Sequence, residues 1–290
     1  MFNFKWMPFL KGVRFKQLSH SQRQMVNHFE FHHEITTKDL LFKNMMCYAE
    51  LNKINVFDYV PLTFLVDVDA QTYTPDLAKF IQCYEAIEGI ANAADKNSPD
   101  YCKLCLKLIN AKIQQINISK ERRAVCHCRP KLVDTHFAGK NLWILKATGF
   151  NRGRGVSMFD SMEKLRNLIK YYSGDSSTIA PKEDSVQGML MSVKSRTFVI
   201  QKYIERPLLI YGRKFDIRVW VLVTHEMKIY FFKEGYIRTS SAEYSLDSES
   251  IEKFNVHLTN NAVQKHYQQY GEFEDGNQLS FDDFQVRCKV

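Results

Sequence analysis

Residues 197–218, TFVIQKYIERPLLIYGRKFDIR, constrain the fold of this chain more than any other stretch. The segment opens with a short apolar run that ends in Gln201–Ile204, and Pro207 and Gly212 then break the pattern. From 215 to 224 the apolar residues follow a period of two, which is typical of a β-strand. The pattern predicts two strands joined by a turn.

Three charged residues share one face at the start of the second strand. Side chains two residues apart on a strand lie side by side, so Lys214, Asp216 and Arg218 are neighbours. Such charges are costly to bury without partners. They form either a self-neutralising cluster on an edge strand or a site for a phosphate and its metal. Because both faces are apolar beyond Arg218, we favour a central strand with a site at its mouth.

The charge of the chain is unevenly distributed. Its net charge is +8 over 290 residues, but residues 241–290 carry −5 and residues 1–240 carry +13. A basic body predicts an anionic partner. No apolar run approaches membrane-spanning length, and the N-terminus lacks the uninterrupted apolar core of a signal peptide. Seven cysteines without a secretory context predict reduced thiols in a cytoplasmic protein without membrane insertion.

The N-terminal half reads as helices around one buried strand. We expect an amphipathic helix over 1–24, interrupted at Pro8 and Gly12, and a helix within 25–55 capped by Thr36 or Thr37 with Asp39. A buried strand is expected within 56–68. Two helices follow, at Pro75–Ala94 and Asp100–Ile116.

Two groups of residues have spacings similar to those of metal-binding sites. His28 and His32 lie one helical turn apart beside Glu30 and His33, but no third ligand follows at a standard spacing. Cys102 and Cys105 precede the segment Cys126–Cys128, whose Cys-x-Cys half is irregular for zinc. A surface role for the histidines and core packing for the helical cysteines are favoured, so we expect no metal site within this chain.

A glycine-rich hairpin carries the second candidate site. The apolar strand Asn141–Lys146 ends in a lysine and leads into the tip Asn151–Gly155, followed by a second strand. Glycines permit close backbone approach, and exposed N–H groups with arginines can cover a phosphate chain. No Walker A or Rossmann fingerprint is present. Asp160 with Glu163 is expected to cap the next helix, and 173–195 to form a polar loop.

The C-terminal part continues as strands and short helices. Segments 227–232 and 235–240 are expected to complete an antiparallel meander, with Arg238 at its end. Polar groups of 256–266 stand at the mouth of a helix, and the last 20 residues are loop-like with a helical pattern around 281–285. This order suggests ATP between two β-rich lobes. Lys146 and the hairpin would cover its phosphates, and the Gln201–Ile204 backbone would act as a hinge that reads the adenine edge.

Several motifs resemble the tubulin–tyrosine ligase-like family, a branch of the ATP-grasp fold. They are NHFEFHHEITTKDLLFKN, WILK with NRGRGV, VIQKYIERPLLIYGRKFDIRVWVLVT, GYIRTS and HLTNNAVQK. Together they cover most of the chain. The resemblance implies an α+β fold with two β-rich lobes and helices around a nucleotide cleft. The regions would be an N-terminal lobe (1–70), a helical linker region (71–140), a central lobe (141–205) and an incomplete C-terminal lobe (206–290).

The resemblance also implies a chemistry: ATP phosphorylates an acceptor carboxylate, and an amino acid's amine attacks the acyl-phosphate, with Mg²⁺ as cofactor. Implied phosphate-binding residues are Lys146, Arg152, Gly153, Arg154, Gly155 and Val156. Implied adenine-binding and other nucleotide-binding residues are Gln201, Lys202, Tyr203, Ile204, Lys214, Asp216, Thr259 and Asn260. Arg218 and Lys214 would act in catalysis, and Arg238 and Lys265 would hold the free amino acid.

The implied partner is tubulin or the microtubule, bound through its acidic tails, in the cytoskeleton or a cilium. Two departures from the family pattern matter. Asn261 and Ala262 stand where glutamate-adding members carry Tyr-Ser, which favours glycine. The family's Mg²⁺ ligands belong to a segment after Val290, so the C-terminal part of the fold is expected to be missing. The alternative is a non-catalytic microtubule- or nucleotide-binding relative. Nucleic-acid binding is disfavoured because the aromatics lie in apolar periodic segments.

Overall fold

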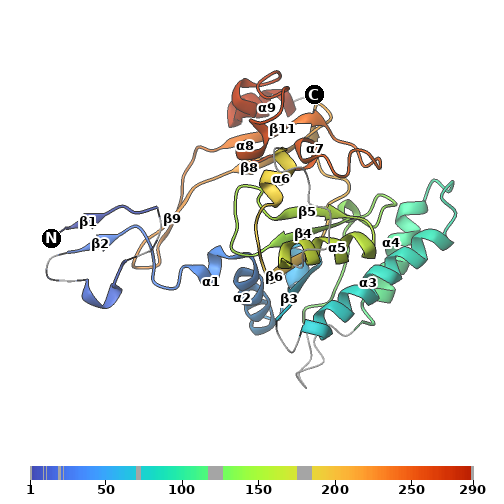
Figure 1. Ribbon diagram of the computed structural model, residues 1–290, viewed down its shortest axis with the longest axis horizontal. Coiled ribbons are helices and arrows are strands. Elements are labelled where there is room, and N and C mark those ends of the chain that lie inside the picture. The colour runs from blue at the N-terminus through green and yellow to red at the C-terminus, as the bar shows by residue number, and fades with distance from the viewer. Residues whose placement is uncertain are drawn as a thin grey trace.

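The protein combines two four-stranded antiparallel sheets with nine helices among the residues that the structure describes (Figure 1). This computed structural model describes residues 2–8, 10, 12–18, 21, 23–69, 73–116, 127–174 and 185–288. The α-helices are α1 His33–Thr36, α2 Lys38–Leu51, α3 Tyr73–Ala93, α4 Tyr101–Ile113, α5 Met162–Ser173, α6 Val186–Met191, α7 Phe254–His257, α8 Asn261–Gln264 and α9 Phe281–Cys288. The strands are β1 Phe4–Lys5, β2 Met25–Val26, β3 Thr63–Asp67, β4 Trp143–Ala147, β5 Val156–Phe159, β6 Thr197–Lys202, β7 Leu209–Ile210, β8 Arg213–Arg218, β9 Val221–Val223, β10 Ile229–Phe231, β11 Tyr236–Glu243 and β12 Gln278–Ser280.

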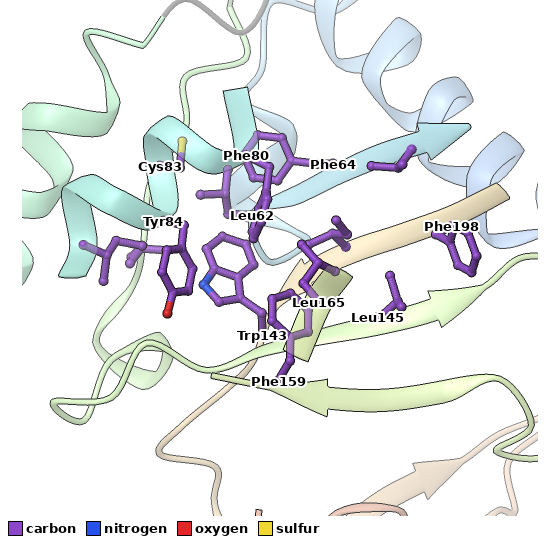
Figure 2. Close-up of a cluster of buried hydrophobic side chains, with 14 of the residues drawn as sticks. Leu62, Phe64, Phe80, Cys83, Tyr84, Trp143, Leu145, Phe159, Leu165 and Phe198 are labelled. Carbon is purple, nitrogen blue, oxygen red and sulfur yellow. The ribbon is translucent and has the colours of Figure 1, made fainter. Parts of the chain in front are cut away.

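The first sheet has the order β3-β6-β4-β5, and the largest core lies on one of its faces. The register pairs Phe64 with Ile200, and Trp143 with both Lys202 and Phe159. Phe80 of α3 meets the Trp143 ring edge-on, with ring centroids 4.9 Å apart (Figure 2). Burial of apolar side chains such as these supplies the main stabilisation of a domain. Period-two geometry sends the alternate residues, among them Lys146 and Gln201, to the opposite face.

The second sheet has the order β12-β11-β8-β7. One face packs Ile237 and Leu279 against Phe215 and helix α9. Beside this cluster Arg213, 2% exposed, forms an ion pair with the buried Glu274. Lys214, Asp216 and Arg238 consequently lie on the other face of the sheet.

The expected long strand over 215–224 is interrupted. β8 is central, between β11 and β7, as predicted, but it ends at Arg218. β9 pairs only with β10, in a separate hairpin whose residues Leu222 and Ile229 are 63% and 71% exposed. The apolar alternation beyond Arg218 is therefore not buried within the described chain, because no described strand extends the sheet past that residue.

Other boundaries also differ from expectation. Residues 1–24 hold β1 and a single 3₁₀ turn among their described positions instead of an amphipathic helix. Ser161, not Asp160, caps α5, because its hydroxyl accepts from the Lys164 amide. Helix α6 lies in the expected loop 173–195.

The predicted meander is also modified. β11 pairs directly with β8, and the β9–β10 hairpin lies outside that sheet. The C-terminal segment contributes β12 to the same sheet and the expected short helix, α9.

Several predicted elements are confirmed. β3 lies within 56–68, and α3 and α4 match the two expected helices with a short turn between them. β4 and β5 form the predicted antiparallel hairpin. Thr37 occupies the N-cap position of α2, although its hydroxyl donates to the His33 carbonyl instead of capping the helix.

Candidate functional site

Lys146 and Gln201 are in direct contact on the face of the first sheet that lies opposite its largest core and lines a cavity, which we call the cleft. The Lys146 ammonium donates to Gln201 Oε1 over 2.6 Å, and Gln201 Nε2 donates to Thr63 Oγ1 over 2.9 Å. These residues come from the neighbouring strands β4, β6 and β3. The hydrogen bonds fix the direction of the lysine side chain before any ligand binds.

Lys38 is a site residue that the motif analysis did not select. Its ammonium donates to the carbonyls of Ala147, at 3.1 Å, and Phe150, at 2.5 Å, and so holds the first half of the glycine-rich loop. The signal was available, since Lys38 ends the segment NHFEFHHEITTK that contributed to the family resemblance. Lys38 and Lys146 line the same cavity of about 220 Å³, together with Thr63 and Gln201.

On the second sheet, Lys214 begins a chain of hydrogen bonds. Its ammonium donates to the Tyr203 hydroxyl at 2.9 Å and to the His257 carbonyl at 3.1 Å. The Tyr203 hydroxyl lies 2.9 Å from His257 Nδ1, and His257 Nε2 lies 2.9 Å from the Ser250 carbonyl. Because that carbonyl can only accept, Nε2 carries the proton and Nδ1 accepts from Tyr203. These hydrogen bonds join β8 and α7 to Tyr203, the residue that follows β6.

The charge of Lys146 on the first sheet reaches Lys214 on the second sheet. Burial, with the positive charge of Lys38, lowers the pKa of Lys146 to about 8. Burial, with the positive charge of Lys146, lowers the pKa of Lys214 to about 8, although Asp216 opposes the shift. The two ammonium groups therefore lie within electrostatic reach of each other. An anion placed beside both would restore their charges, and a nucleotide phosphate fits that requirement.

Asp216 and Arg238 form a paired unit on the same face. They are register partners on β8 and β11, and both carboxylate oxygens accept from the guanidinium, Oδ1 from Nε at 2.9 Å and Oδ2 from the terminal nitrogen. The hydrogen bonds from Asp216 raise the pKa of Arg238. The family resemblance implies that Arg238 binds the carboxylate of the free amino acid, but in this structure Arg238 binds the carboxylate of Asp216.

The tip of the glycine-rich hairpin contacts the start of α8. A Cβ added to Gly153, which has φ +81°, would lie 2.6 Å from Val263 and 3.7 Å from Asn260 Oδ1. The structure thus brings the predicted phosphate loop beside Asn260, and Thr259 adjoins it. The N–H of Gly155 donates to the Leu190 carbonyl and that of Arg154 to the Asn151 carbonyl. These two amides are therefore engaged within the fold.

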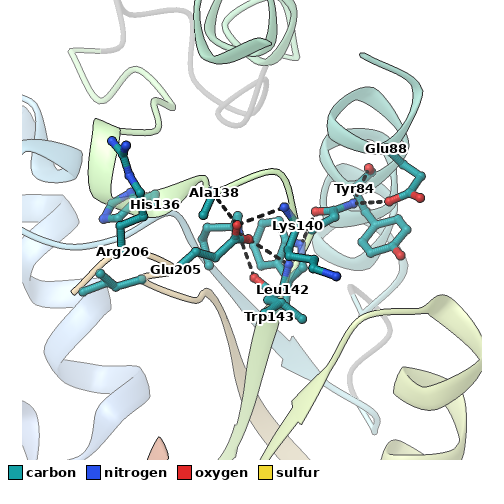
Figure 3. Close-up of polar contacts among 12 residues, drawn as sticks. Tyr84, Glu88, His136, Ala138, Lys140, Leu142, Trp143, Glu205 and Arg206 are labelled. Carbon is teal, nitrogen blue, oxygen red and sulfur yellow. Dashed lines mark hydrogen bonds and ion pairs between the residues drawn. The ribbon is translucent and has the colours of Figure 1, made fainter. Parts of the chain in front are cut away.

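The side chain of Lys202 points away from the cleft, so any contact of this residue with a nucleotide would fall to its backbone. It is fully buried on the core face of β6, where it donates to Glu205 Oε1 at 2.5 Å and to the Leu142 carbonyl at 2.9 Å. Glu205 also accepts from the amides of Ala138, Lys140 and Leu142 (Figure 3). The reason is parity: adjacent strand residues face opposite sides, and Gln201 faces the cleft.

The backbone of the hinge segment is partly engaged. The Lys202 amide donates to the Leu62 carbonyl at 2.8 Å and the Tyr203 amide to the Leu142 carbonyl at 3.1 Å. The Tyr244 hydroxyl donates to the carbonyl of Ile204. If this segment binds the edge of an adenine base, it must use backbone groups other than these two amides and this carbonyl.

The remaining predicted site residues lie nearer the surface. Arg152 and Arg154 are exposed at the hairpin tip, and Val156 begins β5. Arg218 is exposed at the end of β8, and Lys265 is exposed at the end of α8. Among the described residues, no side-chain hydrogen bond or ion pair joins these residues to Lys146 or Lys214.

The described residues do not fit a Mg²⁺ site. They contain no group of three or more His, Cys, Asp or Glu side chains that could hold a metal ion. Asp216, the carboxylate beside the lysines, is engaged by Arg238. Cys105 is 0% exposed inside α4, which favours packing over ligation, and Cys126 lies outside the described residues.

Comparison with known proteins assigns the family. The model of the "Tubulin-tyrosine ligase family" matches residues 16–288, nearly the whole chain. This chain belongs to the tubulin-tyrosine ligase family. The ATP-grasp-like fold expected of the family agrees with the mixed helices and antiparallel sheets described above.

Similar relatives carry glycylase names. The chain is 38% identical over 44% of its length to tubulin glycylase 3A of Drosophila melanogaster. It is 31% identical over 69% of its length to tubulin monoglycylase TTLL3 of Homo sapiens, and 33% identical over 63% to protein monoglycylase TTLL8 of Mus musculus. These matches span 11%, 22% and 18% of the respective relatives, so the chain corresponds to less than a quarter of each. None of the helices in the described ranges is long and apolar enough to cross a membrane.

Proposed function

We propose that this chain carries the nucleotide-binding part of an ATP-dependent ligase that joins an amino acid to glutamate side chains of tubulin tails. Glycine is favoured over glutamate, by the residues Asn261 and Ala262 and by the glycylase names of the relatives. The reaction class is activation of the acceptor carboxylate as an acyl-phosphate, followed by attack of the amine. Cytoskeletal or ciliary microtubules are the expected place of action.

The observation that carries the proposal is the pair Lys146 and Lys214. They come from different sheets, burial lowers the pKa of each to about 8, and the positive charge of Lys146 contributes to the lowered pKa of Lys214. Two desolvated ammonium groups in one place are unfavourable unless an anion joins them. A nucleotide polyphosphate supplies that anion, and the two sheets then act as the two lobes of an ATP-grasp cleft.

The other residues take roles around this pair. Gln201 orients Lys146, and Tyr203 with His257 orients Lys214. Lys38 holds the glycine-rich loop, and Gly153 places the loop against Asn260.

The remaining roles follow the family resemblance. Arg218 would stabilise the acyl-phosphate, Arg238 and Lys265 would hold the amino acid, and Asp216 would contact the nucleotide. The regional boundaries at 70, 140 and 205 remain our proposed division of the chain.

Calorimetric titration of the chain with ATP tests the nucleotide site. We expect Lys146→Ala to weaken binding by about tenfold or more, because an oriented cation is lost from the phosphates. Lys170→Ala is the matched control, since Lys170 is exposed on α5 away from the cleft-facing residues. Equal ATP affinity in wild type and Lys146→Ala would contradict the site.

A second candidate is a non-catalytic nucleotide- or microtubule-binding module. The observation in its favour is that the described residues contain no carboxylate cluster for Mg²⁺. Incorporation of labelled glycine and glutamate into microtubules separates the two candidates. Glycine incorporation that Arg218→Ala abolishes, with ATP affinity unchanged, supports the ligase. ATP binding without incorporation of either amino acid supports the module.

A further inference from the structure

Helix α4 has two faces of different character. Its inner face consists of Tyr101, Cys105, Ile109 and Ile113, each at most 9% exposed. Their i, i+4 spacing fixes the rotation of the helix against the core. The outer face is therefore equally fixed and is not used by the described fold.

The outer face alternates cations with leucines. Lys103, Lys107 and Lys112 are exposed, and Leu104 and Leu108 are 54% and 56% exposed. At 1.5 Å per residue this stripe is about 13 Å long. The helix contains no acidic residue, and none of the three lysines takes part in an ion pair found between described residues.

The neighbouring helix α3 differs from the outer face of α4 in the sign of its charge. α3 and α4 pack side by side at one edge of the molecule (Figure 1). The charged residues on α3 are Asp76, Glu85, Glu88 and a single lysine, Lys79. Charge is thus segregated between the two helices, which leaves the outer face of α4 positive.

We propose that the outer face of α4, defined by Lys103, Leu104, Lys107, Leu108 and Lys112, is a docking surface for an acidic protein surface on the acceptor. Its partner carries carboxylates that pair with the lysines around apolar side chains that cover the leucines. The identity of that acceptor as the microtubule rests on the proposed function. This surface lies on a different helix from the residues of the cleft. It would contact the acceptor protein at a point away from the glutamate that receives the amino acid.

The chemistry of the stripe favours a protein over other anionic partners. A membrane-surface helix buries a broad apolar face in lipid, but the broad apolar face of α4 is already in the core. Phosphate backbones are bound by cations and stacking aromatics, and the outer face carries leucines instead of aromatics. Interspersed leucines suit the mixed surface of a folded protein.

Co-sedimentation with stabilised microtubules tests the surface. We expect the double variant Lys103→Glu/Lys107→Glu to weaken binding by about tenfold, and salt to weaken the wild type, because both act on the charge pairing. Leu104→Gln/Leu108→Gln should weaken it without changing the salt dependence. The matched control is Arg166→Glu/Lys170→Glu, an exposed i, i+4 pair on α5.

The outcomes separate this inference from the proposed function. Equal binding by wild type and the Lys103/Lys107 variant, or an equal loss in the α5 control, overturns the docking surface. Absence of wild-type binding to microtubules, or binding to anionic vesicles instead, also overturns it. Calorimetry with ATP on the same preparations reports the nucleotide site separately and should give unchanged affinity in every variant.

Discussion

Nucleotide binding should be coupled to proton uptake, because the site contains two lysines with a pKa of about 8. With a pKa of about 8, Lys146 and Lys214 should each be about half deprotonated at pH 8 when no anion is bound. A bound polyphosphate favours the charged form and returns both pKa values toward their ordinary range. Binding should then take up about one proton in total at pH 8, and about 0.2 at pH 7. Affinity should fall as the pH rises above 8, since the lysines lose charge in the free protein.

The assay is calorimetric titration with ATP at pH 8 in two buffers of different ionisation enthalpy. The slope of the observed enthalpy against the buffer enthalpy gives the number of protons taken up. Lys146→Met should remove about half of the uptake. Lys38→Met should also reduce it, because the charge of Lys38 helps to lower the pKa of Lys146. Tight binding with no buffer dependence at pH 8 would refute the placement of the two lysines at the phosphates.

Three further predictions concern single contacts. Glu205→Ala should destabilise the fold by about 3–5 kcal/mol, because it leaves the buried ammonium of Lys202 without its ion-pair partner, and adding Lys202→Met should recover part of the loss. Urea unfolding measures the stability of both variants, and a loss below about 1 kcal/mol in Glu205→Ala would contradict this account. Gly153→Ala should cost about 1–3 kcal/mol and weaken ATP binding, because the positive φ and the contact with Val263 exclude a Cβ; unchanged stability in the same assay would show that the tip can move. Asp216→Asn should raise the affinity for glycine about threefold or more, because it releases the guanidinium of Arg238. Calorimetric titration with glycine measures this affinity, and a lower affinity in the variant would count against the role of the Asp216–Arg238 pair.

Local sequence patterns were sufficient to predict those helices and strands whose apolar residues are also the ones buried in the structure. β4 and β6 are short apolar runs, β8 follows a period of two, and α3 and α4 follow a period of 3.6, so their existence could be predicted from the residues alone. The hairpin with Gly153 at its tip was predictable for the same reason. The motifs were also specific enough to indicate the family, which the match over 16–288 establishes.

Only the tertiary structure decided which face of each strand points into the cleft. Parity requires Gln201 and Lys202 to face opposite sides, but the packing of Trp143 and α3 determines that Lys202 is the one that enters the core. Lys38 is more than 100 residues from the loop that it holds, so its role depends on long-range contacts that no local pattern encodes. The end of β8 at Arg218 is likewise set by the extent of its neighbours, because a strand persists in a sheet only where another strand supplies its hydrogen bonds.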